Sequence, residues 1–538
     1  MISVVRLRAL LALGQSSVND LLIRNGQLVI GDKVVAGDVA VHDGIIVEIG
    51  QRLSLNARRV IEAEGMHVCP GFIDMHSHSD LALLDANGKD WKLRQGVTTE
   101  VIGNCGFSLF PVLPEHGGEA FDFLASLFSG ISRDDLCKDL AEYFRRLEKP
   151  NINVVSFVGH NMLRIGVNGN DAEISSQRMG EMGKLLDEQL EQGAAGMSTG
   201  LIYLPACFAD NEELLGLARG VKKRGKIMAW HIRSEGDGEE KALQEVLDVA
   251  QVSGVNTEIS HLKVSGRRNH GRMSCVLEEI ERSIGEGNAV AFDAYPYTFG
   301  NTTILTLLPD WALADKLPDL CDKLAGETFR ERIRADMRKS GSVFMSVGSD
   351  KIILAACNEA ENEEMQGRSL EEAARLRGSD VCELVMDLIV SEKGKTSIFL
   401  FQADERDLRL ALASKYGVLG TDGIPLGDKS HSRLENAFLR FLGHCVAVEK
   451  ICSLPEAVAK MSLLPARNMG LTRRGGLEAG NFADICIFDL DKIKVQERDG
   501  LREQWRGVDY VVLNGKVVVE KTEYNGVCAG RNLTTDKH

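Results

Sequence analysis

Two histidines separated by one residue stand where a predicted buried strand ends. Residues 70–80 form an apolar run, broken by one acid, that starts from a Pro-Gly turn. Successive side chains on a strand point to opposite faces, so His76 and His78 share one face. Two imidazoles side by side at a strand end suit a borderline metal ion such as zinc. Two ordinary polar residues at a strand-to-loop junction would look the same, so the pair needs support from elsewhere in the chain.

Other residues that can bind a metal also follow predicted strands. Cys105 follows the second predicted strand, and Asp422 follows the eighth. Where strands and helices alternate around a barrel, catalytic groups come from the C-terminal ends of the strands. Packing alone does not explain four histidines, one cysteine and one aspartate at one rim. We therefore predict a metal site formed by His76, His78, Cys105, His231, His261 and Asp422.

The elements that must position these residues alternate along the chain. Apolar runs ending in polar residues predict eight strands, at 68–78, 98–104, 153–160, 194–200, 226–233, 256–263, 289–297 and 418–422. Helical patterns lie between them, as at residues 176–193 and 239–254. This alternation is typical of an α/β fold with a (β/α)8 TIM-like barrel. A doubly wound sheet is the alternative, but no Gly-x-Gly-x-x-Gly turn follows a strand.

Short alternating strands with turn signals occupy both ends of the chain, within residues 19–68 and 472–525. Because chain ends often lie close together, we expect them to build one small β-sandwich domain beside a barrel domain at 69–471. The strand–helix rhythm breaks at about residues 306–395, which are charged and helical in pattern. We expect this insertion to form a helical lobe over the barrel mouth. A solvated lobe at the periphery is the alternative interpretation.

Composition narrows the range of partners. The 538 residues include 63 Lys and Arg against 78 Asp and Glu, a net charge of -15. That balance argues against nucleic acid and anionic membranes as partners. The 12 cysteines form no Cys-x-x-Cys pair, and no apolar run approaches the roughly 18 residues that span a bilayer. We expect a cytoplasmic protein that acts on a small molecule.

Taken together, the motifs resemble those of the amidohydrolase superfamily and, within it, the N-acyl-D-amino-acid deacylase (D-aminoacylase) family. The similarity covers about residues 20–520. It rests on 70–80 (PGFIDMHSHSD), 103–108 (GNCGFS), 159–164 (GHNMLR), 196–203 (GMSTGLIY), 231–235 (HIRSE), 259–263 (ISHLK), 293–297 (DAYPY) and 421–423 (TDG), with support from 461–468 and 475–489.

The resemblance implies a zinc-dependent hydrolase. Cys105, His231 and His261 would hold one tightly bound zinc ion. His76 and His78, with Cys105 as a bridge, would form a second and weaker site. A thiolate and two imidazoles leave one position of tetrahedral zinc open for water. Asp422 would be the base that takes a proton from this water and returns it to the leaving nitrogen.

The carboxylate of an amino-acid product needs local positive charge in this acidic protein. Lys263 shares a strand face with His261, and Arg433 offers a planar fork that suits a carboxylate. The resemblance implies that both residues, with Tyr203, bind this carboxylate, while Tyr295 lines the pocket or packs in the core. The family usually has His-Pro-Arg where this chain has His-Ser432-Arg, and we expect the loss of proline to loosen the loop that carries Arg433.

The expected activity is hydrolysis of N-acyl-D-amino acids to a carboxylate and a free D-amino acid. One alternative is a reaction on cyclic amides, as in dihydroorotases and hydantoinases, whose two metals are bridged by a carboxylated lysine on strand four. Residues 194–200 (AAGMSTG) contain no lysine. A non-catalytic barrel homologue is the other alternative, but it would be expected to lack the ligands. The sequence leaves open the side-chain preference (neutral, D-Glu or D-Asp), the acyl group, the number of metals and the oligomeric state.

Overall fold

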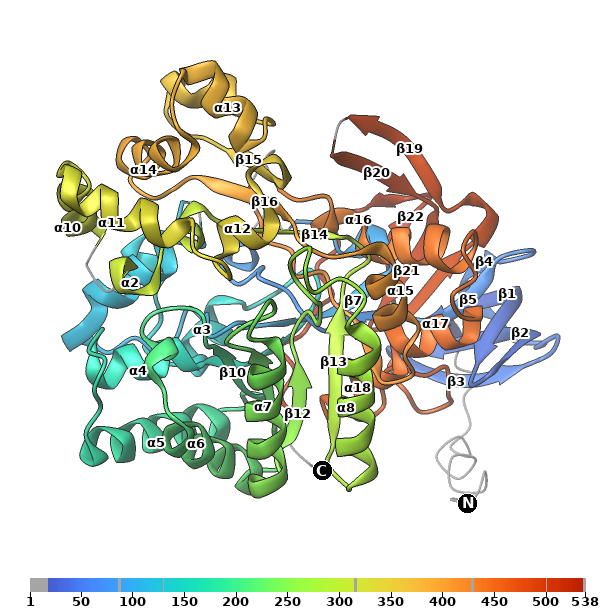
Figure 1. Cartoon of the computed structure of the whole chain (residues 1–538). Coiled ribbons are helices and arrows are strands. Elements are labelled where there is room, and N and C mark those ends of the chain that lie inside the picture. The colour runs from blue at the N-terminus through green and yellow to red at the C-terminus, as the bar shows by residue number, and fades with distance from the viewer. Residues whose placement is uncertain are drawn as a thin grey trace.

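The computed structural model describes residues 18–85, 89–128, 130–313, 317–426, 430–499 and 501–535. It shows the expected α/β architecture, with parallel strands surrounded by helices and additional sheets around them (Figure 1). Among the described residues, no helix combines the length and the apolar character needed to cross a membrane.

The parallel strands form two sheets. The first contains β6 (Phe72–Asp74), β7 (Val97–Ile102) and β8 (Asn153–Ser156). The second contains, in sheet order, β17 (Gly417–Leu419), β13 (Val290–Ala294), β12 (Asn256–Ile259), β11 (Ile227–His231), β10 (Gly196–Gly200) and β9 (Val158–Gly159). The sheets adjoin twice: Phe157 separates β8 from β9, and Ser77 forms an isolated parallel bridge with Gly423. The C-terminal ends of the strands therefore face the same side.

Helices alternate with these strands and cover them. They are α2 (Gly117–Ala125), α3 (Leu140–Arg146), α4 (His160–Asn168), α5 (Ser176–Glu191), α6 (Asn211–Lys223), α7 (Glu239–Ser253), α8 (Met273–Gly285), α15 (Glu405–Ala413), α16 (Arg433–Arg440), α17 (Leu454–Met461) and α18 (Leu463–Asn468). Helix α7 shows why they form as predicted. Its apolar face, with Leu243 and Val246, is buried. It ends at Gly254, whose φ of 67° lets its N–H donate to the Ala250 carbonyl.

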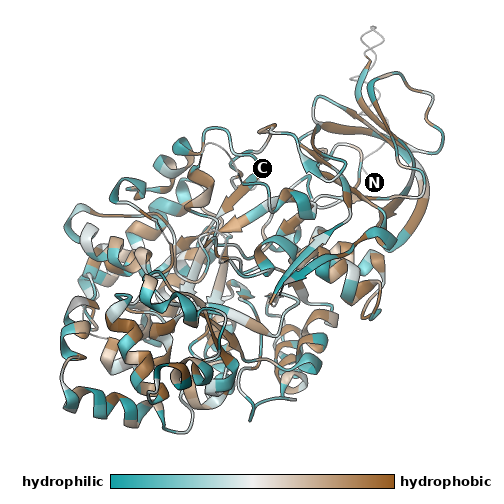
Figure 2. Ribbon diagram, turned by 90° about the horizontal axis from the view of Figure 1, so that it is seen from above, coloured by the Kyte–Doolittle hydropathy of each residue, from teal (hydrophilic) through white to brown (hydrophobic). Residues whose placement is uncertain are grey.

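Strands from both ends of the chain pair in one nine-stranded sheet. It contains β1 (Asn19–Ile30), β2 (Lys33–His42), β3 (Ile45–Gly50), β4 (Ala57–Glu62), β5 (His67–Pro70), β18 (Ile485–Phe488), β21 (Val508–Leu513), β22 (Lys516–Glu520) and β23 (Glu523–Tyr524). The two ends meet where β18 pairs antiparallel with β5. Seen from above, this sheet lies beside the strand–helix part (Figure 2). The domain boundaries at 19–68, 69–471 and 472–525 stay a prediction.

The segment after β13 is not purely helical. It contains an antiparallel sheet of β14 (Phe299–Thr303), β16 (Ser397–Phe401) and β15 (Ile352–Ala356). Around it lie α9 (Asp310–Leu313), α10 (Leu317–Lys323), α11 (Glu327–Met337), α12 (Val343–Val347), α13 (Leu370–Arg377) and α14 (Val381–Ser391). A hydrophobic cluster of its own, which includes Leu354 and Leu388, holds this segment together. These strands were not predicted because β15 and β16 are short, mostly apolar runs, which do not distinguish strand from buried helix, and β14 (Phe-Gly-Asn-Thr-Thr) has no apolar pattern.

A buried ion pair connects the nine-stranded sheet to the parallel strands. Asp484 precedes β18 and pairs with Arg474, and the two side chains are only 6% and 4% exposed. The Asp484 carboxylate also accepts hydrogen bonds from Asn514 N at 2.7 Å and from Asn153 Nδ2 at 3.2 Å. Because Asn153 opens β8, these bonds fix the sheet of the chain ends against the strands that carry the site.

Arg474→Ala should destabilise the whole fold, because it leaves the buried Asp484 carboxylate without its cation. We expect a loss of about 3–5 kcal/mol in the free energy of unfolding, measured by denaturant titration. The matched control is Arg473→Ala, since Arg473 is exposed and its guanidinium donates to the Gly480 carbonyl. Equal losses in the two variants would contradict this role of the ion pair.

Candidate metal centre

The loops after β6 and β17 are joined through the main chain. The carbonyl oxygen of His76 accepts hydrogen bonds from Asp422 N at 2.8 Å and from Thr421 N at 3.1 Å. The buried carboxylate of Asp74 accepts a second hydrogen bond from Thr421 N, at 2.8 Å. These bonds hold Asp422 beside His76 and His78, although more than 340 residues separate the two loops.

Three of the six predicted residues have a left-handed backbone. The φ angles are 53° at Cys105, 39° at His261 and 48° at Asp422. This conformation costs a residue other than glycine roughly 1–3 kcal/mol and concentrates at functional sites. The turn before Cys105 requires glycine, because a Cβ at Gly103 would lie 2.2 Å from the Phe157 carbonyl oxygen. These strained turns carry the side chains of Cys105, His261 and Asp422, whose donor atoms lie close together.

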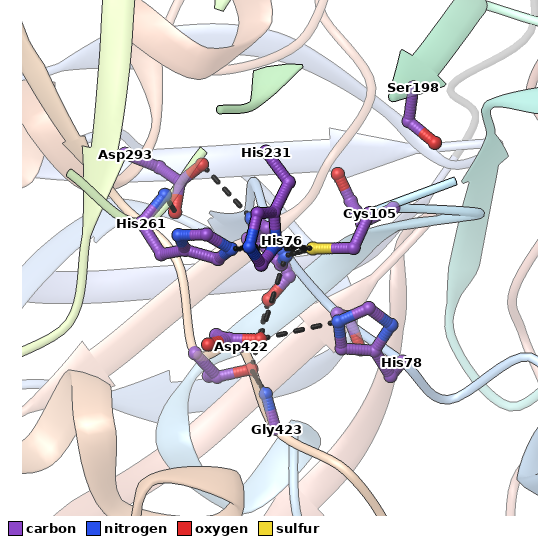
Figure 3. A network of polar contacts seen from close by, with 12 residues as sticks. His76, His78, Cys105, Ser198, His231, His261, Asp293, Asp422 and Gly423 are labelled. Atoms are coloured by element: carbon purple, nitrogen blue, oxygen red, sulfur yellow. Dashed lines mark hydrogen bonds and ion pairs between the residues drawn. The ribbon is translucent and has the colours of Figure 1, made fainter. Parts of the chain in front are cut away.

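The six side chains form two groups that share one sulfur atom (Figure 3). In the first group, Cys105 Sγ lies 3.4 Å from both His231 Nδ1 and His261 Nε2, which are 2.9 Å apart. In the second, His78 Nε2 lies 3.2 Å from Asp422 Oδ1, and the members are His76, His78, Cys105 and Asp422. Within each group the donor atoms lie within 4.8 Å of one another, and all the residues are buried.

The donor set fits a tetrahedral metal ion. Ligands at the usual distances from zinc lie roughly 3.3–3.8 Å from one another, close to the separations in the first group. Burial raises the pKa of the Cys105 thiol to about 11, so its thiolate forms near neutral pH only beside a cation. Burial lowers the pKa of His231 and of His261 well below its usual value, which keeps both imidazoles neutral, as metal ligation requires.

The model of the amidohydrolase family matches residues 59–519. The chain belongs to the amidohydrolase family. It is similar to N-acyl-D-glutamate deacylase of Alcaligenes xylosoxydans xylosoxydans, with 34% identity over 506 residues and 93% of each chain covered. D-aminoacylase of the same organism is 32% identical over 523 residues, which cover 96% of this chain and 97% of that protein. These similarities confirm the resemblance inferred from the motifs.

A solved structure also shows similarity to a deacylase. The protein superposes with a TM-score of 0.82 on the crystal structure of N-acyl-D-glutamate deacylase from Bordetella bronchiseptica. That structure contains zinc and a phosphonate inhibitor that mimics the tetrahedral intermediate of the reaction. The two sequences are 30% identical, and the match covers 96% of this chain and all of that one. The α/β fold of this amidohydrolase is therefore that of the deacylase structure.

Two carboxylates that the sequence analysis did not single out hold the histidines in place. Asp293, at the end of β13, lies 3.1 Å from His76 Nδ1 and accepts a hydrogen bond from His261 N at 3.0 Å. Glu235 Oε1 lies 2.9 Å from His261 Nδ1. Carboxylates on the outer ring nitrogen orient metal-binding histidines. The sequence did contain a sign of these two acids, because Glu235 lies in the 231–235 motif and Asp293 in the 293–297 motif. The sequence analysis gave neither acid a role.

The centre opens into a cavity of about 230 Å³. Its wall includes both metal-binding groups except His76, together with the four predicted substrate-binding residues Tyr203, Lys263, Tyr295 and Arg433. The guanidinium of Arg433 lies 2.9 Å from Asp422 Oδ2 and 4.5 Å above the Tyr295 ring. Among the described residues, Arg433 Nε and Tyr295 OH have no hydrogen-bond partner. Both buried donors are thus available to a ligand. By contrast, Lys263 Nζ already donates to Glu235 Oε1 at 2.6 Å.

The serine that stands in place of proline gives the Arg433 loop a different support. Ser432 Oγ donates to the Leu501 carbonyl at 3.0 Å and accepts from Glu503 N at 3.0 Å. Both partners belong to the hairpin of β19 (Lys494–Asp499) and β20 (Arg502–Arg506). His431 Nδ1 also accepts a hydrogen bond from Arg433 N at 2.9 Å. Hydrogen bonds therefore support the loop at the position of this serine, and the expected loosening of the loop stays a prediction.

Cys105→Ala should remove metal from both groups at once, because each depends on the same sulfur atom. His78→Ala should leave the group of Cys105, His231 and His261 intact and keep its metal. The check is the metal content per chain after zinc loading and dialysis. Cys137→Ala is the matched control, since Cys137 is an equally buried cysteine outside both groups. A Cys105 variant with the metal content of the wild type would refute the shared-ligand assignment.

Proposed function

We propose that this amidohydrolase cleaves the amide bond of N-acyl-D-amino acids and releases a carboxylate and a free D-amino acid. The observation that carries the proposal is the pair of metal-binding groups joined by Cys105, with Asp422 beside them and a small cavity in front. The deacylase names of the relatives support the same substrate class.

The first group is proposed to hold a tightly bound zinc ion, and the second a weaker one. Cysteine and two histidines are a donor set typical of zinc and leave one coordination position open. When bound, zinc would polarise the scissile carbonyl and increase the acidity of water. His76 and His78 would complete the second site, for which the side of Cys105 Sγ facing His76 Nε2, 3.2 Å away, is available.

Asp422 is proposed to be the general base. Burial alone would raise the pKa of its carboxyl group, but Arg433 and His78 hold this pKa well below its usual range. The carboxylate is therefore ionised and can accept a proton from the attacking water. It then donates this proton to the nitrogen of the departing amino acid, which leaves as a neutral amine. The hydrogen bonds from its own main-chain N–H and that of Thr421 to His76 O keep the carboxylate in place.

The α-carboxylate of the substrate is proposed to bind Arg433 and Tyr295, which both line the cavity and each have a donor without a hydrogen-bond partner. Tyr203 and Lys263 complete this end of the cavity wall. Burial raises the pKa of Tyr203 well above its usual value, so its hydroxyl keeps the proton that it can donate. A carboxylate held here would place the neighbouring amide next to the metal-binding groups.

The alternatives have less support. For hydrolysis of cyclic amides, β10 would have to supply a bridging lysine, but its sequence is Gly-Met-Ser-Thr-Gly. A non-catalytic role does not explain a complete donor set beside an ionised aspartate.

We further propose that the two parallel sheets together form a (β/α)8 barrel, supported by their two junctions. A cytoplasmic location is supported by the 12 cysteines, which form no disulfide in the described part of the chain.

Asp422→Asn should keep the metal of the first group and lower kcat for N-acetyl-D-methionine by a factor of roughly 100 to 10,000, because the amide cannot accept the proton. Asp350→Asn, a surface aspartate paired with Arg267, is the control and should behave like the wild type. N-acetyl-L-methionine, assayed on the same zinc-loaded protein, should be a poor substrate. Wild-type turnover in Asp422→Asn would exclude Asp422 as the base, and equal hydrolysis of both enantiomers would exclude the D-specific reaction.

A further inference from the structure

Residues 300–402 contribute a large part of the cavity wall, and none of the described residues of this segment that line the cavity is charged. Nine residues between 300 and 402 line the cavity, from β14, α12, β16 and their loops. They are glycine, asparagine, threonine, valine, serine, leucine and glutamine residues, including Asn301, Thr302, Val343, Leu400 and Gln402. The opposite wall adds apolar side chains, such as Phe107, Leu127 and Ile424.

Among the described residues that line the cavity, three carry a permanent positive charge, and one of them is Arg233. Each nitrogen of its guanidinium has a partner in the protein, and its side chain is 28% exposed. Nε donates to Glu245 Oε2 at 2.9 Å, Nη1 donates to the Cys207 carbonyl at 2.7 Å, and Nη2 donates to the Ala209 carbonyl. Glu245 neutralises the charge of Arg233, and every guanidinium nitrogen already has a hydrogen-bond partner. Arg233 would therefore bind the side-chain carboxylate of an acidic substrate only weakly.

The other two cations are Lys263 and Arg433. The proposed function assigns Arg433 to the α-carboxylate and places Lys263 at the same end of the cavity wall. Lys263 is in addition neutralised by Glu235, 2.6 Å away. Three carboxylates of the protein, Glu235, Asp237 and Asp422, also line the cavity. An acidic substrate side chain would therefore lose water without gaining a cation and would lie near like charges. Such a loss of solvation without compensation is strongly unfavourable.

We infer that the preferred substrates are N-acyl-D-amino acids whose side chain is uncharged, and that acidic side chains are rejected. This inference rests on the proposed function and adds the class of side chain to it. It separates this chain from the 34% identical relative named as an N-acyl-D-glutamate deacylase. The wall of apolar and amide-bearing residues suits both aliphatic and amide side chains.

The test compares two nearly isosteric substrates, N-acetyl-D-glutamine and N-acetyl-D-glutamate, on the full-length, zinc-loaded protein. We expect kcat/KM to favour the glutamine derivative by a factor on the order of 100, with N-acetyl-D-methionine also a good substrate. Equal or greater kcat/KM for the glutamate derivative would overturn the inference and leave the proposed deacylase function standing. No release from any of the three D-substrates would instead overturn the proposed function.

A single variant tests the electrostatic cause. Glu245→Gln keeps the shape of the side chain but removes the charge that neutralises Arg233, while Glu245 itself does not line the cavity. The preference for glutamine over glutamate should narrow by a factor of about 10, mainly through a lower KM for N-acetyl-D-glutamate. Activity on N-acetyl-D-glutamine reports that the variant is folded. An unchanged ratio in an active variant would refute the assignment of the selectivity to the neutralised Arg233.

Discussion

The buried thiol of Cys105 is the group on which the centre depends. Its sulfur lies 3.2 Å from His76 Nε2 and 3.4 Å from His231 Nδ1 and His261 Nε2. Because burial raises the pKa of this thiol to about 11, the thiolate and the bound cation require each other. Metal binding must therefore release the thiol proton, and one residue couples the charge of both groups. The left-handed backbone of Cys105, with a φ of 53°, belongs to the turn that carries the sulfur at this shared position.

Behind the metal-binding groups lies a second set of charges that fixes their orientation. Asp293 and Glu235 occupy the outer nitrogens of His76 and His261. A third buried charge, Lys92, contacts Asp74 and donates a hydrogen bond to Thr421 Oγ1 at 2.5 Å. Since the next residue after Thr421 is Asp422, this buried cation helps to hold the loop of the base against β6. The centre is thus rigid because its supporting residues are buried and paired.

The strand ends were the part of the site most accessible from the sequence. Alternation along each strand and the common direction of parallel strands together place His76, His231 and Asp422 at one rim, however far apart they lie in the chain. The acids Asp293 and Glu235 were not assigned, because their role depends on which histidine faces them across the rim.

Other features depend on contacts between distant segments that no local pattern encodes. The support of Ser432 comes from a hairpin about 70 residues further along the chain. The antiparallel sheet after β13 pairs β14 with β16 across nearly 100 residues of chain. The pairing of the chain ends was predictable for a different reason, since two segments of similar short strands needed partners and termini often lie together.

The proposed metal centre and the part of the cavity wall formed by residues 300–402 come from different parts of the chain. The ligands are set by the ends of parallel strands within the main hydrophobic core, whereas much of the cavity wall comes from a segment with its own core. A substitution in that segment can change the charge facing the substrate side chain while the strand ends of the proposed metal site keep their packing. For this chain, the uncharged wall and the neutralised Arg233 act in the same direction, against a second negative charge.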